Sequence, residues 1–178
     1  MKVKRLLLFA AVFCALLGYV VIFESPDPKK SKAAPQQLVK VFSFPESAIK
    51  SIEISRGPVQ ATLTRHDQLW ELSSPDHAVL NQDQVESLLS SITGLVKIEV
   101  VSEGTEELSQ YGLVNPDMSI TIALEAAPPV TLFIGTNCPT GVSMYGLIKG
   151  TKEVLQIGTL LRFSINSFLD IFVRPASR

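Results

Sequence analysis

The stretch SIEISRGPVQATLTRHDQLWEL, residues 51–72, decides the fold of this chain. Apolar and polar side chains alternate along its first two segments, which Gly57-Pro58 separates. The turn residues His66-Asp67-Gln68 then separate the second segment from a third, short one. A period of two that turn residues interrupt is typical of an antiparallel meander with one face in water. The stretch therefore predicts three consecutive antiparallel strands.

An amphipathic helix is predicted directly after this meander. Asn81 is suited to the N-cap, and Gln84 follows three positions later, as in a capping box. Gly94 lies where the helix should end. Between them, apolar residues recur at helical spacing and form one stripe: Val85, Leu88, Leu89, Ile92 and Leu95. This stripe would cover the dry face of the strands.

The second half of the chain repeats the order of strands followed by a helix. Alternating segments predict strands on either side of Pro128-Pro129, then a hairpin over residues 144–157 and a helix over residues 159–169. A strand near residues 97–101 and a helical turn over residues 106–111, closed by Gly112, connect the two halves. The predicted class is α+β, with two antiparallel sheet-plus-helix halves and a possible internal duplication, preceded by one transmembrane helix.

That transmembrane helix is predicted from an apolar run, Leu6 to Phe23, that follows Lys2, Lys4 and Arg5. Its 18 residues would span about 27 Å as a helix, close to the ~30 Å of a hydrocarbon core. The residues that follow the run lack the small side chains of a cleavage site, which favours an uncleaved anchor over a long signal peptide. The three cations should stay in the cytoplasm, which places the rest of the chain outside.

We therefore expect an N-terminal anchor over residues 1–23, a Pro/Lys-rich linker over residues 24–40 and a periplasmic domain over residues 41–178. The predicted location is the inner membrane, as a single-pass protein with a cytoplasmic N-terminus. Without the three N-terminal cations the chain has 13 basic and 17 acidic residues, a net charge of −4. This balance argues against nucleic acid or an anionic lipid surface as the main partner.

The two cysteines do not predict a disulfide or a lipid anchor. Cys14 lies inside the apolar run and Cys138 in the domain, so they cannot pair within one molecule. Bulky Phe13 precedes Cys14, where a lipid-modified cysteine requires a small neighbour. Cys138 has no His or Lys beside it in sequence and is interpreted as an inert or half-buried loop thiol.

The remaining chemical motifs are weak. His66 and His77 have no metal-ligand spacing and are interpreted as exposed turn residues. The segment 135–141 has glycines at both ends, but it lacks the Lys-Ser/Thr and following helix of a phosphate-binding loop. Nearby carboxylates, Glu99, Glu103, Glu106 and Glu107, fit a solvated face, and Trp70 fits a core anchor. The chain also lacks a G-x-S-x-G elbow, so no catalytic, cofactor or metal residue is predicted.

Several segments, taken in order, resemble the bacterial domain-of-unknown-function family 4340. The most recognisable pieces are Leu108-Ser109-Gln110-Tyr111-Gly112-Leu113 with Pro116, and Leu132-Phe133-Ile134-Gly135. Supporting pieces are Ile49-Lys50-Ser51-Ile52-Glu53-Ile54, Leu69-Trp70-Glu71-Leu72, the Val85/Leu88/Leu89 helix, Met144-Tyr145 and Val154-Leu155-Gln156-Ile157. The resemblance covers roughly residues 45–170 and implies a membrane-tethered periplasmic domain associated with ABC-type export systems. It carries no established catalytic residues.

The expected function is that of a non-enzymatic accessory or scaffold domain, without a cofactor, in a transport or envelope complex. We expect it to contact a partner protein through a strand edge or through the polar sheet face that carries Gln60, Thr62 and Thr64. An alternative of another class is an envelope protein that binds a small ligand or hydrolyses a substrate in a pocket between the two halves. A protein secreted freely after cleavage is the third possibility.

Overall fold

A computed structural model describes residues 39–67, 69–74, 80–104 and 107–173, with side chains as far as residue 171. They lie in one compact unit, residues 38–178. The predicted anchor over residues 1–23 lies outside the described residues, as does most of the predicted linker. Within the described ranges no helix is both long enough and apolar enough to cross a membrane.

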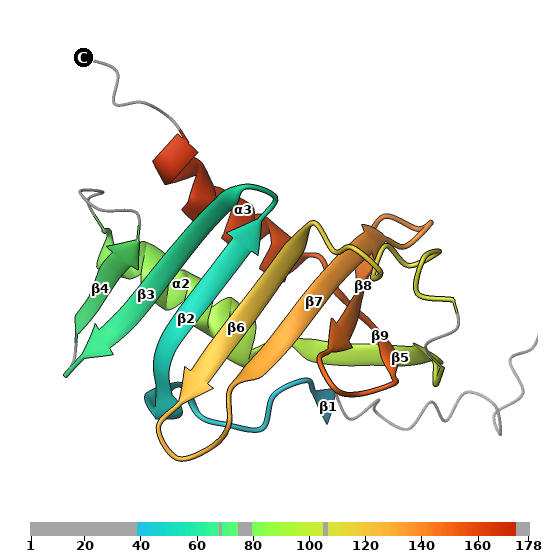
Figure 1. Ribbon diagram of the computed structural model, residues 1–178, viewed down its shortest axis with the longest axis horizontal. Helices are drawn as coiled ribbons and strands as arrows, with labels where there is room; N and C mark the ends of the chain where they lie inside the picture. The colour runs from blue at the N-terminus through green and yellow to red at the C-terminus, as the bar shows by residue number, and fades with distance from the viewer. Residues whose placement is uncertain (1–38, 68, 75–79, 105–106, 174–178) are drawn as a thin grey trace, which may run out of the picture. The chain divides into compact units, whose positions relative to one another are not determined.

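The described strands form one nine-stranded antiparallel sheet in the order β1-β5-β9-β8-β7-β6-β2-β3-β4 (Figure 1). Two α-helices and one 3-10 turn complete the described part of the fold. The bounds are β1 (Val39–Lys40), η1 (Glu46–Ala48), β2 (Ile49–Arg56), β3 (Val59–His66), β4 (Leu69–Ser74), α2 (Gln82–Thr93), β5 (Val96–Ser102), β6 (Met118–Leu124), β7 (Val130–Asn137), β8 (Ser143–Ile148), β9 (Val154–Gly158) and α3 (Leu160–Val173).

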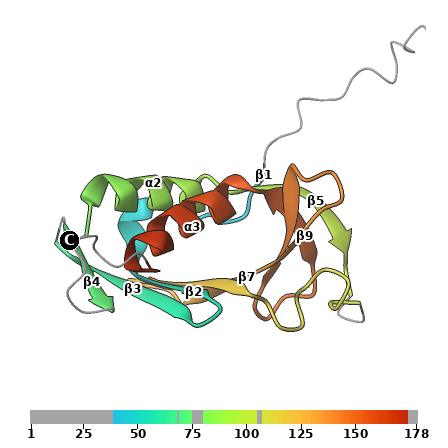
Figure 2. The same cartoon turned by 90° about the horizontal axis from the view of Figure 1, so that it is seen from above.

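Both α-helices lie on the same face of the sheet (Figure 2). Because side chains alternate between the faces of a strand, every second residue in the middle of the central strands points towards the helices, and most of these residues are buried. The largest fully buried side chains come from both layers: Phe168, Ile49, Ile52, Ile54, Leu63, Leu88, Leu89, Ile92, Met118, Ile120, Ile122 and Leu132. The core therefore fills the space between this face and the two helices.

The predicted division into two sheet-plus-helix halves is wrong. Strand β2 pairs with β6 from Ile49 to Arg56, which joins the two predicted sheets edge to edge. The chain leaves β4 at one end of the sheet, passes through α2 and enters β5, which pairs with β9 near the other end. The two halves thus share a single sheet. Alternation shows which face of a strand is buried, but it does not show which strand lies beside it.

Several local predictions are confirmed. The meander over residues 51–72 forms β2, β3 and β4, and the predicted hairpin over residues 144–157 forms β8 and β9. The Asn81 side chain caps α2 by accepting a hydrogen bond of 2.9 Å from the Asp83 N–H, and α2 ends at Gly94. The last helix continues to Val173, one turn beyond the predicted end.

The outer face of the sheet, opposite the helices, is covered by residues 107–117 at the end formed by β7, β8 and β9. This segment contains the predicted helical turn, which ends in a Schellman motif: Leu113 N–H donates to Leu108 O at 2.9 Å and Gly112 N–H to Ser109 O at 3.1 Å. Gly112 has the left-handed φ of 67° that this motif requires. Leu108 and Leu113 join Leu147 and Val154 in a second, smaller core.

Gly135 on β7 lets this covering segment approach the sheet. The N–H of its neighbour Thr136 donates to Tyr111 O at 2.9 Å, which fastens the segment to the strand. A Cβ atom on Gly135 would lie 2.0 Å from Tyr111 O and 3.1 Å from the Leu113 side chain. Glycine is therefore required here to avoid a collision with backbone that cannot move aside.

The exposed edge of β4 is blocked by a side chain. Gln82, the first residue of α2, accepts a 3.2 Å hydrogen bond from Trp70 N–H and donates one of 2.9 Å to Trp70 O. One amide group thus satisfies the donor and the acceptor that a neighbouring strand would otherwise use. An unpaired strand edge invites pairing with another chain, so Gln82 protects this end of the sheet.

We predict that Gly135→Ala destabilises the domain by ~2–3 kcal/mol, because the added methyl group displaces the segment that carries Tyr111 and Leu113. Urea unfolding of the full chain measures this loss. Gly158→Ala is the matched control, since a Cβ there has no neighbour within 4 Å. Equal stability of the two variants would contradict the role assigned to Gly135.

Replacing Gln82 by alanine should leave the Trp70 N–H and C=O without partners and cost about 1–3 kcal/mol. The opened edge should also promote self-association that increases with protein concentration. Denaturation followed by analytical ultracentrifugation checks both effects. Gln84→Ala, at an exposed position of the same helix, should change neither measurement. If Gln82→Ala behaves like Gln84→Ala, the edge does not depend on this amide.

Candidate functional site

The residues considered for chemistry from the sequence do not come together. His66 is exposed at the end of β3, where its Nε2 lies 3.8 Å from Glu71 Oε2. His77 and Glu106 lie outside the described residues. Glu99, Glu103 and Glu107 are exposed, and Trp70 is buried in the core. Across residues 39–67, 69–74, 80–104 and 107–173, no three His, Cys, Asp or Glu side chains are grouped as a metal site would require.

The glycine-bounded segment 135–141 connects β7 to β8 and uses its amides within the fold. Cys138 N–H donates to Ser143 O at 2.9 Å, and Gly141 N–H donates to Cys138 O at 2.9 Å. A phosphate-binding loop would instead direct such amides towards a ligand at the start of a helix. This segment holds the hairpin end in place, as expected of a connecting loop.

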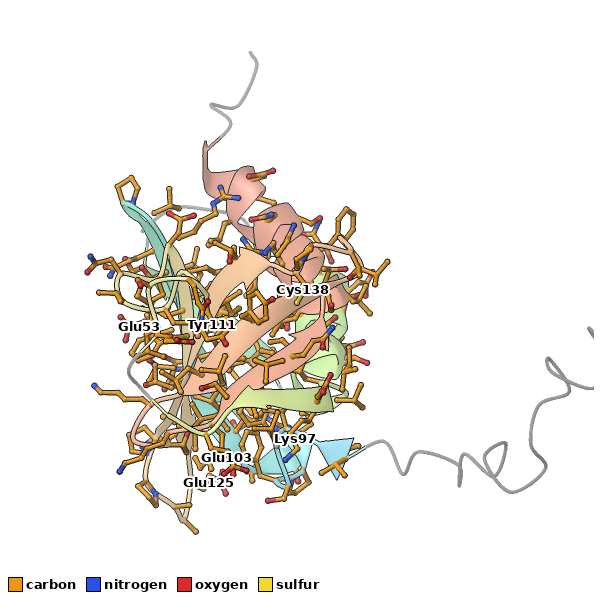
Figure 3. The ribbon with its side chains drawn as sticks, turned by 90° about the vertical axis from the view of Figure 1, so that its right-hand side faces the viewer. Glu53, Lys97, Glu103, Tyr111, Glu125 and Cys138 are labelled. Carbon is orange, nitrogen blue, oxygen red and sulfur yellow. The ribbon has the colours of Figure 1, made fainter. Side chains whose placement is uncertain are left out.

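Cys138 lies in a small cluster with two tyrosines and is only 6% exposed. The rings of Tyr111 and Tyr145 meet edge to face, with centroids 4.8 Å apart. Figure 3 shows Tyr111 on the same side of the sheet as Glu53, opposite the helices. Beside the rings, Gln156 Nε2 donates to Ser143 Oγ at 2.6 Å. The cluster therefore joins β8, β9 and the covering segment at the outer face.

The pKa of Tyr145 is raised, first by a side-chain hydrogen bond with Cys138 and then by burial. A raised pKa keeps the phenol protonated, so Tyr145 is not prepared to act as a base at neutral pH. The tyrosine and cysteine pair thus fits a structural role at the hairpin.

The described hollows lie along the outer side of the helix layer, in a groove between α2 and α3. One hollow of about 150 Å³ lies beside Leu88, Phe163 and Phe168, with Gln84, Ser87, Ser164 and Ser167 around it. A second of about 260 Å³ lies where the end of α2 meets the start of α3, beside Leu95, Leu160 and Leu161. We call this surface the α2–α3 groove.

Apolar side chains on α3 border the groove and face water. Leu160 is 67% exposed and Phe163 is 69% exposed, and their spacing of three places them one turn apart on the helix. Ile171, 36% exposed, continues the line two turns beyond Ser164. A helix that is apolar on its outward side as well as its core side usually has a second partner.

Three hydroxyl groups on the floor of the groove, those of Ser87, Ser91 and Ser164, have partners inside the protein. Ser91 and Ser164 share a hydrogen bond of 2.8 Å that links the two helices. Ser87 Oγ donates to Asp83 O at 2.9 Å, and Ser164 Oγ donates to Leu160 O at 3.1 Å. Because these hydroxyls are already satisfied, the floor can be covered without leaving them unpaired.

Sequence reasoning did not identify this groove. It assigned Leu161, Ile165, Phe168 and Leu169 to the core side of the last helix, and all four are buried. The signal for a second apolar side was nevertheless present, because nine of the 14 residues of α3 are apolar. One stripe cannot account for so many apolar residues on an amphipathic helix.

We predict that the Tyr145 phenol titrates above the ordinary tyrosine range and that Cys138→Ala lowers its pKa. The folded chain holds this proton more tightly than the unfolded chain. The resulting stabilisation should be complete at pH values below the pKa that Tyr145 has in the unfolded chain. It should be lost as the pH rises through the pKa that Tyr145 has in the folded chain. An NMR titration of ring-labelled tyrosines, assigned with Tyr145→Phe, measures the shift. An unchanged pKa in Cys138→Ala would show that the thiol is not its cause.

A family model described as a domain of unknown function, DUF4340, matches residues 70–174, more than half of the chain. The match begins at Trp70 and includes α2, α3 and the strands β5 to β9. No curated protein and no solved structure matches the chain.

Proposed function

We propose a function from the premise that this chain belongs to the DUF4340 family, which confirms the resemblance noted in its ordered motifs. In this proposal the chain is a membrane-anchored, extracytoplasmic accessory domain that binds another protein of an ABC-type transport or envelope complex. The apolar run Leu6 to Phe23, with cations before it, supports the anchor and the orientation. The transport setting follows from the family resemblance.

The observation that carries the binding role is the exposed apolar border of the α2–α3 groove. Leu160 and Phe163 each keep two thirds of their surface in water, beside hollows lined by other apolar side chains. Covering apolar surface contributes roughly 25 cal/mol per Å², and aromatic anchors in such hollows dominate many protein interfaces. A partner protein that covers these side chains would therefore gain affinity from them.

The surfaces expected from the sequence to make this contact are less suited to it. The β4 edge is blocked at Trp70 by Gln82. On the polar face of the sheet, hydroxyl groups pair across strands: Thr64 with Ser73 at 2.9 Å, and Thr121 with Thr131 at 3.0 Å. Groups that already have partners within the sheet offer less to a second protein, so we favour the groove.

The alternative function, a ligand-binding or hydrolytic protein with a pocket between two halves, gains no support from a specific observation. The two halves share one sheet, and large side chains fill the space between that sheet and the helices. His66, one candidate for such a pocket, is exposed at a hairpin end.

We predict that the full-length protein, tagged and extracted from native membranes in mild detergent, copurifies with a transporter or envelope protein. The matched control carries the same residues 1–37 fused to an unrelated exported domain, so that capture by the anchor alone is subtracted. Quantitative mass spectrometry compares the two samples. If the same proteins are recovered from both, the folded domain contributes no partner and the proposed function fails.

A further inference from the structure

We propose that the α2–α3 groove binds an amphipathic α-helix of a partner protein, one with a single apolar stripe and basic residues flanking it. This inference rests on the proposed function, because it specifies the partner that the accessory domain would bind. It concerns the described helices α2 and α3 and the side chains between them.

The shape of the groove fits a helix better than an extended peptide. Its two walls are helices that lie side by side on the same layer (Figure 2), and the Ser91–Ser164 hydrogen bond holds them together. The 14 residues of α3 give a wall of about 21 Å. A strand added to the fold would need free backbone donors and acceptors, which the interior of a helix does not offer.

Small residues along the floor allow a third helix to approach closely. Ser87 and Ser91 lie four residues apart on α2, facing Ser164 and Ser167 across the groove. Small side chains at such positions reduce the distance between packed helices. The two hollows lie on either side of the Ser91–Ser164 contact and have apolar walls, so they would receive successive apolar side chains of one stripe.

The charges on the two helices favour a basic partner. In the described part of α2 and α3 the ionisable side chains are Asp83, Glu86, Arg162 and Asp170. Arg162 donates to Gly135 O beneath the helix, and Asp170 pairs with Arg56 at 2.9 Å. Asp83 remains exposed on α2, one turn before Ser87 of the groove. Lysine or arginine on the flank of a docked helix would complement this carboxylate.

The same charges disfavour two other occupants. An anionic lipid surface would be repelled by Asp83 and Glu86, whereas helices that lie on membranes usually present basic residues. A second copy of this surface would bring carboxylates of the same sign into the interface. We therefore commit to a partner helix, and the experiment below distinguishes these occupants.

The test uses a fluorescent peptide of about 14 residues, the length of α3, with leucine at positions i, i+3, i+4, i+7 and i+11 and lysine on both flanks. The full chain is held in phosphatidylcholine nanodiscs, and empty nanodiscs give the background. Fluorescence anisotropy should show saturable binding. A scrambled peptide without a stripe, and a peptide with glutamate in place of lysine, should each bind about tenfold more weakly.

Variants of the chain locate the binding site. Leu160→Ser and Phe163→Ser should each weaken peptide binding by about tenfold, because they remove exposed apolar walls without touching the core. Asp83→Asn should also weaken peptide binding, because it removes the exposed carboxylate one turn before Ser87. Val142→Ser is the matched control, since Val142 is 74% exposed but lies in the β7–β8 connection, outside the groove.

Three results would overturn the inference. These are equal binding of the striped and scrambled peptides, equal binding by Phe163→Ser and Val142→Ser, or self-association of the chain that Leu160→Ser abolishes. Repeating the copurification with Phe163→Ser distinguishes a failure of the groove inference from a failure of the proposed function. If the partner is still recovered, the accessory role stands and the groove is not its site.

Discussion

The fold depends on one requirement: two helices must keep water from the apolar face of a nine-stranded sheet. Most of the isoleucines and leucines of β2, β3, β6 and β7 that point to this face are fully buried, because α2 and α3 lie across them. Since α2 starts beside β4 and leads into β5 near the opposite end, the helix also connects the ends of the sheet. Covering the core and connecting the chain are therefore done by the same element.

This requirement explains the features on the rest of the molecule. The outer face needs less cover, because its strands present serine, threonine and glutamate there, and only the end formed by β7 to β9 has an apolar patch. Residues 107–117 cover that patch, and they can do so only because Gly135 has no side chain. At the other end, α2 supplies the amide of Gln82 that closes the β4 edge. Single residues thus permit both features: Gly135 admits the covering segment, and Gln82 closes the β4 edge.

The surface that remains unexplained by folding is the outward side of the helix layer. Burial of the sheet accounts for Leu161, Ile165, Phe168 and Leu169, but not for Leu160 and Phe163. Exposed aliphatic and aromatic side chains beside hollows oppose solubility unless something covers them. This contrast between the two sides of α3 is what directs the functional proposal to the groove. The histidines, carboxylates and the Cys138 cluster show no comparable arrangement among the described residues.

Local structure could be predicted from the sequence because local rules depend on neighbours along the chain. Alternation along residues 51–72 determined the strands, Asn81 and Gly94 determined the ends of α2, and Gly112 determined the end of a turn. The groove could have been inferred only in part, from the excess of apolar residues in α3. The pairing of β2 with β6 and of β5 with β9, the Gln82–Trp70 contact and the meeting of Ser91 with Ser164 were decided by the tertiary structure alone. Each of them joins segments that are separated along the chain, and no local pattern shows which distant segment a surface will contact.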